Sequence, residues 1–215
     1  MSRRKKRRKP VKKERKKTIG YVHGLGSTAN SRTVQLLRKY LPEYDVISDD
    51  VDIRPQYAAW DGGCFGSFDL MIGSSLGGFY AQEGIAKYWI LINPALDPVP
   101  ILREKVGCGT YEYFDERKDG IRTYTLDEKW FEELEKVHGD IENHFAMFPA
   151  YQEEMYDRTY IFLGRNDPLI EYEEIEPELK KHYNMDHIQF VEMEHRVTEE
   201  FVRDILVPFI KKLPL

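Results

Sequence analysis

The stretch Asp69-Leu-Met-Ile-Gly-Ser-Ser-Leu-Gly-Gly78 decides the predicted fold. It is a short apolar run that ends in a Gly-x-Ser-x-Gly pattern centred on Ser75 and then passes into residues 79–86. A serine between two glycines, where a strand turns sharply into a helix, is typical of a nucleophile elbow. Gly73 and Gly77 leave room for the turn, which exposes the Ser75 hydroxyl at the sheet edge. Acyl-group chemistry is therefore the leading hypothesis, and an ordinary glycine-rich turn is the alternative.

Charged residues are divided unevenly along the chain. Of the 32 Lys and Arg residues, twelve lie in residues 1–17 together with one of the 37 acidic residues, so this segment carries +11. The rest of the chain carries −16, a division that the net charge of −5 hides. The distribution predicts a basic tail over 1–17 and an acidic globular domain over 18–215. The acidic, tyrosine-rich domain argues against nucleic-acid binding by the domain itself.

Composition narrows the class of protein further. No apolar run follows the basic segment as in a secretory signal peptide, and no window of 18 apolar residues predicts a transmembrane helix. The two cysteines, Cys64 and Cys108, are too few for a disulfide framework and lack metal-ligand spacing. We expect reduced thiols, a cytoplasmic location, and neither a metal nor a cofactor.

Short apolar runs alternate with helical patterns along the domain, and a length of 215 residues suits one such domain. The predicted strands are 18–23, 44–48, 69–73, 87–93, 159–164 and 187–192. A helix is predicted over 31–41, and an amphipathic helix over 197–212 closes the fold. Continuous apolar strands separated by helices predict an α/β fold, with about six mostly parallel strands covered by helices on both faces.

The segment of about residues 96–157 interrupts this alternation. It is rich in aromatic residues and carries an acidic helical stretch near 126–137. An insertion between two strands is a natural cap over a ligand site, and we predict a helical cap here. The alternative is a helical excursion that buries only its own aromatic side chains.

Polar residues follow several of the predicted strands, and ligands of open α/β sheets bind at the carboxyl ends of the strands. Ser75 follows the third strand, Asp167 the fifth and His195 the sixth. Ser, then Asp, then His is the order of the catalytic triad in α/β-hydrolases. Of the six histidines, only His195 follows the last strand, so we expect it to act as the base for Ser75.

Asp167 is expected to orient the imidazole, although Asn-Asp-Pro is also a strong turn signal by itself. The oxyanion of the reaction needs two donors, and we expect the backbone N–H groups of Leu25 and Leu76 to supply them. His23 and Gly24 end the first strand beside this loop and are expected to support it.

These motifs resemble those of the small YqiA/YcfP-type esterases of the α/β-hydrolase superfamily, from residue 19 to the end of the chain. The stretches that carry the resemblance are Tyr21–Ser27, Ile72–Ala81, Ile92–Ala95, Gly164–Asp167 and His195–Arg196. The pattern of residues 119–124, followed by an acidic helix, is similar to that family's cap.

The resemblance implies a compact, cytoplasmic, bacterial hydrolase that acts on small carboxylic esters or thioesters without a cofactor. It also implies Ser75, Asp167 and His195 as the catalytic triad. The basic segment 1–17 has no counterpart in the resemblance.

Two other functions compete with this interpretation. Gly24-Leu-Gly-Ser-Thr-Ala29, with Asp49 or Asp50 following, matches a dinucleotide-binding fingerprint. Alternatively, the fold is catalytically silent and the tail 1–17 binds RNA or an anionic surface. A solvated, disordered tail is the plain alternative for that segment.

Overall fold

The computed structural model describes residues 15–58 and 67–215 of the chain. A six-stranded sheet forms its centre, with strand order β10-β9-β6-β4-β1-β2 and every neighbouring pair parallel. Its strands are β1 (Thr18–Val22), β2 (Asp45–Ile47), β4 (Leu70–Ser74), β6 (Trp89–Ile92), β9 (Thr159–Gly164) and β10 (Ile188–Val191). The predicted parallel sheet is confirmed.

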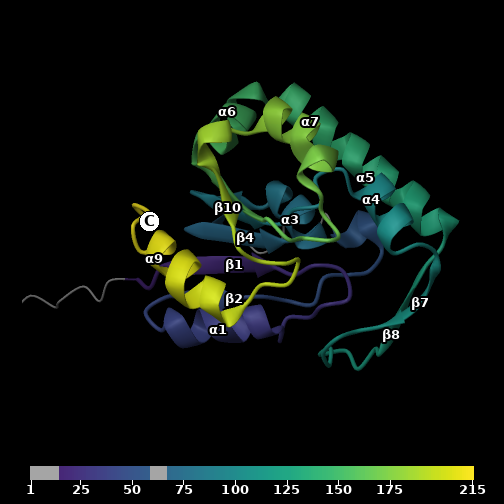
Figure 1. Ribbon diagram of the computed structural model, residues 1–215, viewed down its shortest axis with the longest axis horizontal. Helices are drawn as coiled ribbons and strands as arrows, with labels where there is room; N and C mark the ends of the chain where they lie inside the picture. The colour runs from purple at the N-terminus through teal and green to yellow at the C-terminus, as the bar shows by residue number, and fades with distance from the viewer. Residues whose placement is uncertain (1–14, 59–66) are drawn as a thin grey trace, which may run out of the picture.

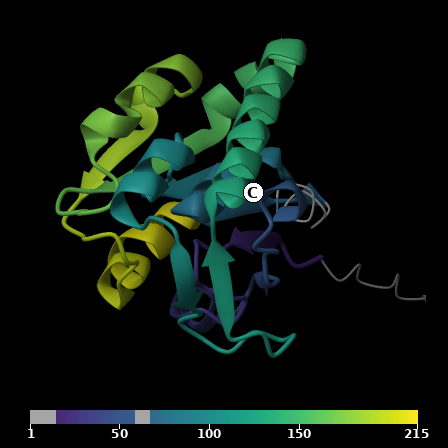
Figure 2. The same cartoon turned by 90° about the vertical axis from the view of Figure 1, so that its right-hand side faces the viewer.

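Helices cover both faces of this sheet (Figures 1 and 2). One face carries α1 (Arg32–Tyr40) and the C-terminal run of α8 (Glu199–Phe201), a π-helical turn (Val202–Leu206) and α9 (Val207–Ile210). The helices on the other side are α3 (Leu76–Tyr80), α4 (Pro98–Lys105), α5 (Glu128–Met147), α6 (Pro149–Arg158) and α7 (Tyr172–His182). Single 3₁₀ turns occupy Ala81–Glu83 and Met185–His187.

Side chains of the central strands alternate between two separate hydrophobic cores. In β6, Trp89 and Leu91 pack in the core beneath α3 to α7, whereas Ile90 and Ile92 pack against α1 and the C-terminal helices. All four residues are fully or almost fully buried. Because both faces of the strand are covered, the sequence reads as one continuous apolar run and not as an alternating pattern.

The start and end of α1 follow from its sequence. Ser31 caps the helix, since its hydroxyl accepts a hydrogen bond from the Val34 amide. Arg38 and Lys39 lie in the last turn, where positive charge interacts favourably with the helix dipole. Pro42 follows the C-cap residue Leu41, as expected of a residue that cannot continue a helix.

Several element boundaries differ from the sequence expectations. The helix after Ser75 is short: α3 ends at Tyr80, a 3₁₀ turn follows, and residues 85–86 form β5 (Ile85–Ala86), which pairs with β3 (Ser67–Phe68). The helix predicted near 126–137 runs to Met147, because its buried residues continue at helical spacing through Ile141 and Phe145.

The segment between β6 and β9 contains α4, α5, α6 and an antiparallel hairpin that the sequence reasoning did not predict. This hairpin joins β7 (Gly109–Glu112) to β8 (Thr123–Leu126). The hairpin projects from α4 and α5 and lies at one side of the sheet (Figures 1 and 2). Its strands are short and alternate in burial, which is why they were hard to recognise within an aromatic-rich segment.

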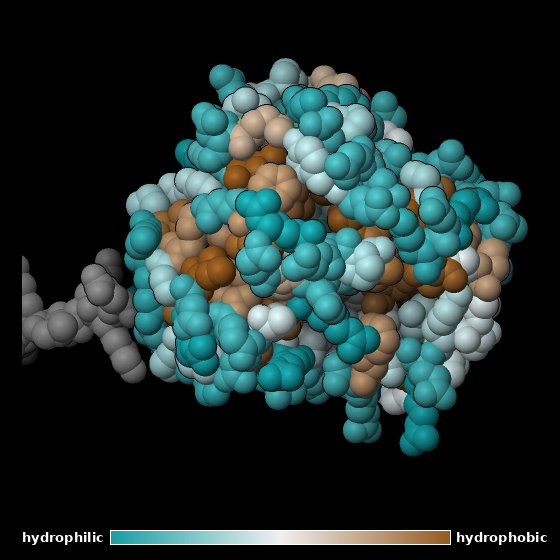
Figure 3. All heavy atoms as spheres, in the orientation of Figure 1, coloured by the Kyte–Doolittle hydropathy of each residue, from teal (hydrophilic) through white to brown (hydrophobic). Residues whose placement is uncertain are grey.

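Hydrophilic residues dominate the face of the molecule in Figure 3, and hydrophobic residues show mainly in the recesses between elements. None of the described helices is both long and apolar enough to cross a membrane. Cys108 is an exposed free thiol. Cys64 and most of the predicted basic tail lie outside the described residues.

We expect Gly77→Ala to destabilise the protein by about 3 kcal/mol or more, because the new methyl group would overlap the Val22 and His23 carbonyl oxygens. Gly139→Ala is the matched control, since this glycine lies within α5 with nothing near its missing side chain. That change should stabilise the protein by about 1 kcal/mol through helix propensity. Urea unfolding of both variants measures the difference, and equal effects would contradict the packing argument.

Candidate active site

The sheet register brings the carboxyl ends of the central strands to one edge. Gly73 of β4 pairs with Val22 of β1, and Ser74 pairs with Ile92 of β6. Ile92 in turn pairs with Phe162 of β9. The residues that follow these strands therefore meet at the same edge, where α/β folds bind their ligands.

Ser75 has the backbone conformation of a sharp strand-to-helix turn. Its φ of 56° and ψ of −127° lie in a sparsely populated region for a residue with a side chain. Two backbone hydrogen bonds hold it there, from Ser75 N to Ile92 O at 3.0 Å and from Ala95 N to Ser75 O at 3.1 Å. A methyl group on Gly24 would lie 3.6 Å from the Ser75 hydroxyl oxygen. The turn therefore sets this hydroxyl beside the loop that follows β1.

Asp167 and His195 lie in contact. His195 Nδ1 is 2.8 Å from Asp167 Oδ2. The other carboxylate oxygen of Asp167 accepts hydrogen bonds from the Leu169 and Ile170 amides at 2.8 and 3.0 Å. The Asp167 side chain is 1% exposed and that of His195 is 18% exposed, so a buried carboxylate holds a ring that solvent can reach. Among the described residues, no hydrogen bond joins this ring to the Ser75 hydroxyl.

Asn93 is a site residue that the sequence reasoning missed. Its side chain is buried, and its amide nitrogen donates to the carbonyl oxygens of Glu194 and His195 at 3.0 and 3.2 Å. Its amide oxygen accepts from Gly164 N at 2.7 Å. Asn93 thus ties the end of β9, which leads to Asp167, to the loop that carries His195. The signal in the sequence is an asparagine directly after an apolar strand, since asparagine tolerates the positive φ of 44° that the structure shows here.

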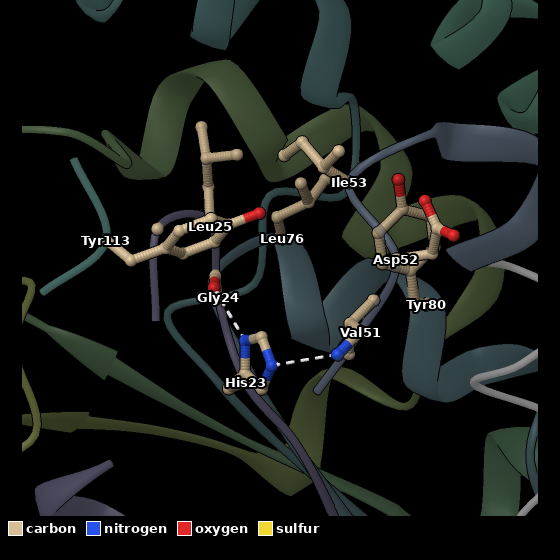
Figure 4. Close-up of a pocket in the computed structure, with 10 residues that line it drawn as sticks. His23, Gly24, Leu25, Val51, Asp52, Ile53, Leu76, Tyr80 and Tyr113 are labelled. Atoms are coloured by element: carbon tan, nitrogen blue, oxygen red, sulfur yellow. Dashed lines mark hydrogen bonds between the residues drawn. The ribbon is translucent and has the colours of Figure 1, made fainter. Parts of the chain in front are cut away.

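The predicted oxyanion residues line a common pocket. Leu25 and Leu76 both border a small pocket with about 20 Å³ of space, room for roughly one water molecule (Figure 4). Leu76 is the first residue of α3, where a backbone N–H has no partner within the helix. Within the described part of the chain, no hydrogen bond from the Leu25 amide is found either. These two amides therefore remain candidate donors near Ser75.

His23 has a structural place beneath this pocket. Val51 N donates to its Nε2 at 3.0 Å, and its Nδ1 lies 3.0 Å from the Gly24 carbonyl oxygen (Figure 4). Since Nε2 is the acceptor, Nδ1 carries the proton and the ring is neutral. Burial lowers the pKa of His23 to about 4, in spite of the opposing effects of the Gly24 carbonyl and Asp50.

Tyr80 also borders the pocket, and its hydroxyl was not singled out from the sequence. This oxygen is buried and has no hydrogen-bond partner among the described residues. Burial raises the pKa of the Tyr80 phenol, so the group is neutral and can donate or accept one hydrogen bond. An unpaired buried hydroxyl beside a pocket is available to a bound molecule.

The loop that connects β7 to β8 packs over the loop after β1. Phe114 N donates to Gly26 O at 2.8 Å. Asp50 joins the two loops, because one of its oxygens accepts from Ala29 N and the other from Lys118 N, both at 2.7 Å. The hairpin loop therefore closes one side of the pocket, where Tyr113 contributes to the lining.

These contacts argue against the dinucleotide alternative. Asp50, a candidate for ribose binding, already accepts a hydrogen bond from the Ala29 amide of the glycine-containing loop. The space at Gly26 is filled by Tyr124 and Phe114. At the N-terminus of α1 the Ser31 hydroxyl already accepts a hydrogen bond from the Val34 amide.

Residues 64–202 match the Uncharacterised protein family UPF0227. The chain belongs to this family. The match covers more than half of the chain, and it confirms the family that the sequence motifs resembled. A search of the curated proteins found no match to this UPF0227 member.

Solved structures of low sequence identity share the fold. A monoacylglycerol lipase from Paleococcus ferrophilus is 13% identical, with a TM-score of 0.58, over 90% of this chain and 93% of its own. Est1E from Butyrivibrio proteoclasticus is 17% identical, with a TM-score of 0.57, over 91% and 87%. Mouse alpha/beta hydrolase domain-containing protein 10 is 13% identical, with a TM-score of 0.59, over 93% and 90%. The UPF0227 chain therefore has the α/β-hydrolase fold.

We expect Asn93→Ala to destabilise the protein by about 2–4 kcal/mol, because three buried backbone groups lose their partners. Asn93→Gly removes the same hydrogen bonds but adopts a positive φ without strain. It should therefore be the milder change by about 1 kcal/mol. Urea unfolding of the two variants tests both contributions, and wild-type stability in the alanine variant would contradict the role of Asn93.

The stability of the protein should fall as the pH drops from about 6.5 towards 4. The folded state keeps His23 neutral over this range, whereas the unfolded chain binds a proton at the ordinary histidine pKa. Between about pH 7 and about pH 5 the loss due to His23 is about 2 kcal/mol. Urea unfolding across this range should show that the free energy of unfolding depends less steeply on pH in His23→Gln than in the wild type. An equal pH dependence in the two proteins would contradict the conclusion that His23 stays neutral in the folded state.

Proposed function

We propose that this protein is a serine hydrolase of small carboxylic esters or thioesters, with Ser75, His195 and Asp167 as its catalytic triad. The observation that carries the proposal is the 2.8 Å contact between His195 Nδ1 and the buried Asp167 carboxylate, at the same sheet edge as the strained turn of Ser75. A serine hydroxyl is a weak nucleophile without a base, and an oriented imidazole is the usual base for it.

In this mechanism His195 Nε2 accepts the proton of Ser75 as its hydroxyl oxygen attacks the acyl carbonyl carbon. Asp167 keeps the proton of the imidazole on Nδ1 and stabilises the imidazolium that forms. The oxyanion receives hydrogen bonds from the Leu25 and Leu76 amides. His195 then returns the proton to the leaving alcohol or thiol, and water releases the acyl group from Ser75 by the same steps.

The lack of a hydrogen bond between the Ser75 hydroxyl and the His195 ring among the described residues is compatible with this mechanism. Catalytic hydrogen bonds are often long without substrate and shorten in the complex. Both residues are anchored to residues 92–95: Ser75 by its backbone, and the His195 loop by the Asn93 amide. The shared anchor keeps the two residues at the same edge of the sheet.

The lining of the pocket supports an apolar acyl or alcohol group as substrate. Leu25, Leu76 and Ile53 are apolar, and the space accommodates about one water molecule. A substrate larger than this requires the β7–β8 loop to move, since Tyr113 of that loop borders the pocket. The names of two structural neighbours, a monoacylglycerol lipase and an Est1E bound to ferulic acid, support ester chemistry in general.

A fluorophosphonate probe should label the wild-type protein at Ser75 and leave Ser75→Ala unlabelled. Turnover of short-chain p-nitrophenyl esters should fall by on the order of 10⁴–10⁶ in Ser75→Ala. Mass spectrometry of the adduct identifies the modified serine. Ser74→Ala is the matched control, because this neighbour belongs to β4 and should be dispensable for labelling.

Asp167→Asn tests the acid of the triad in the same assay. The amide favours the wrong imidazole tautomer, so kcat should fall by on the order of 10⁴. Near-normal turnover in this variant would remove Asp167 from the mechanism, and labelling of a serine other than Ser75 would remove the whole proposal.

A further inference from the structure

Helices α5 and α7, on the same side of the sheet, each carry a pair of residues able to bind a metal ion. His138 and Glu142 lie one helical turn apart on α5, and Glu178 and His182 lie one turn apart on α7. Residues four apart share a helix face, so each pair can direct both side chains at one point. We refer to these four residues as the α5–α7 cluster. Ligand atoms of its first three members lie within 4.8 Å of one another.

His182 adds a separate observation, because its ring is buried and one nitrogen has no hydrogen bond. The side chain is only 7% exposed, and Nε2 lacks a hydrogen-bond partner among the described residues. This nitrogen points at the two carboxylates, at 2.8 Å from Glu142 Oε1 and 3.4 Å from Glu178 Oε2. Nε2 therefore has a charged partner but no aligned hydrogen bond, and an ion between the three groups would satisfy all of them.

We propose that the α5–α7 cluster binds one zinc ion and thereby ties α5 to α7. Two histidines and two carboxylates give four protein ligands, which is the coordination number of structural zinc sites. Imidazole nitrogen favours zinc and its transition-metal neighbours over magnesium or calcium, which prefer oxygen ligands only. Tetrahedral zinc sets its nitrogen and oxygen ligands roughly 3.3 Å apart. The separations of His182 Nε2 from Glu142 Oε1 and Glu178 Oε2, 2.8 and 3.4 Å, are close to this value.

Neighbouring groups are compatible with this role. Burial lowers the pKa of His182, although Glu142 and Glu178 oppose the shift. Lys181 pairs with Glu142 Oε2 and leaves Oε1 to the cluster. Gln152 Nε2 lies 2.9 Å from His182 Nδ1. Turning this amide over would let its oxygen accept from Nδ1–H, the outer-shell arrangement typical of ligating histidines.

Such an ion would connect two parts of the chain that already meet through packing and through the Lys181–Glu142 ion pair. Helix α5 belongs to the segment between β6 and β9, and α7 follows β9. None of the three proposed catalytic residues belongs to the cluster, so the inference is independent of the proposed hydrolase activity. With four protein ligands the site is closed, which indicates a structural role and not a catalytic one.

Isothermal titration calorimetry tests the proposal with the full chain, freed of metal by a chelator and titrated with ZnCl₂ in excess MgCl₂. We expect one zinc ion per chain and a rise in the unfolding temperature with zinc but not with magnesium. His138→Gln and Glu178→Gln should each weaken zinc binding about 100-fold. Both positions are partly exposed, so the variants should fold, and circular dichroism checks this.

Glu135→Gln is the matched control, since it removes an exposed carboxylate from α5 outside the cluster and should bind zinc as the wild type does. Cobalt provides a measurement without mutation, because tetrahedral Co²⁺ absorbs visible light far more strongly than octahedral Co²⁺. The absence of zinc binding would overturn the proposal. So would binding that survives in both cluster variants, or binding that is lost in His195→Gln.

Discussion

The backbone of Ser75 is held in a conformation that costs on the order of 1–3 kcal/mol for a residue with a side chain. The missing side chains of its neighbours make this conformation sterically accessible. A methyl group on Gly73 would lie 2.7 Å from the Ala81 Cβ atom, and one on Gly77 would overlap two carbonyl oxygens of the chain after β1. The turn therefore brings β1, β4 and α3 closer together than ordinary residues allow. The position of Ser75 at the sheet edge depends on that close packing.

Burial of the sheet on both faces holds the turn in this strained state. The central strands divide their side chains between two cores, and most of those side chains are less than 5% exposed. Small changes at the strand ends therefore meet a closely packed interior, which has little room to relax. The hydrogen bonds of Asn93 extend the same rigidity from β6 to the loops that carry Asp167 and His195.

Polar contacts connect the segment between β6 and β9 to the loops that surround the site. Arg117 is buried in the β7–β8 loop, where it donates to the Val51 carbonyl oxygen and pairs with Asp119. Asp50 bonds the same loop to the loop after β1. The hairpin is thus fastened by charged groups as well as by the buried side chains of Tyr124 and Leu126. Its role as a cap stays a prediction.

The sequence by itself determined the fold class, the strand order along the chain and the position of the serine turn. Continuous apolar runs indicated strands buried on both faces, and the glycines around Ser75 indicated a turn that other residues could not make. The order Ser75, Asp167, His195 also came from the sequence, and their catalytic roles stay a proposal.

Only the tertiary structure decided which polar groups meet. The β7–β8 hairpin, the tie made by Asn93, the unpaired Tyr80 hydroxyl and the α5–α7 cluster depend on residues far apart in the chain. Local periodicity reports which face of an element is buried but not which element covers it. His182, for example, reads as part of a charged helix, and it becomes a buried imidazole in contact with Glu142 only because α5 packs against α7.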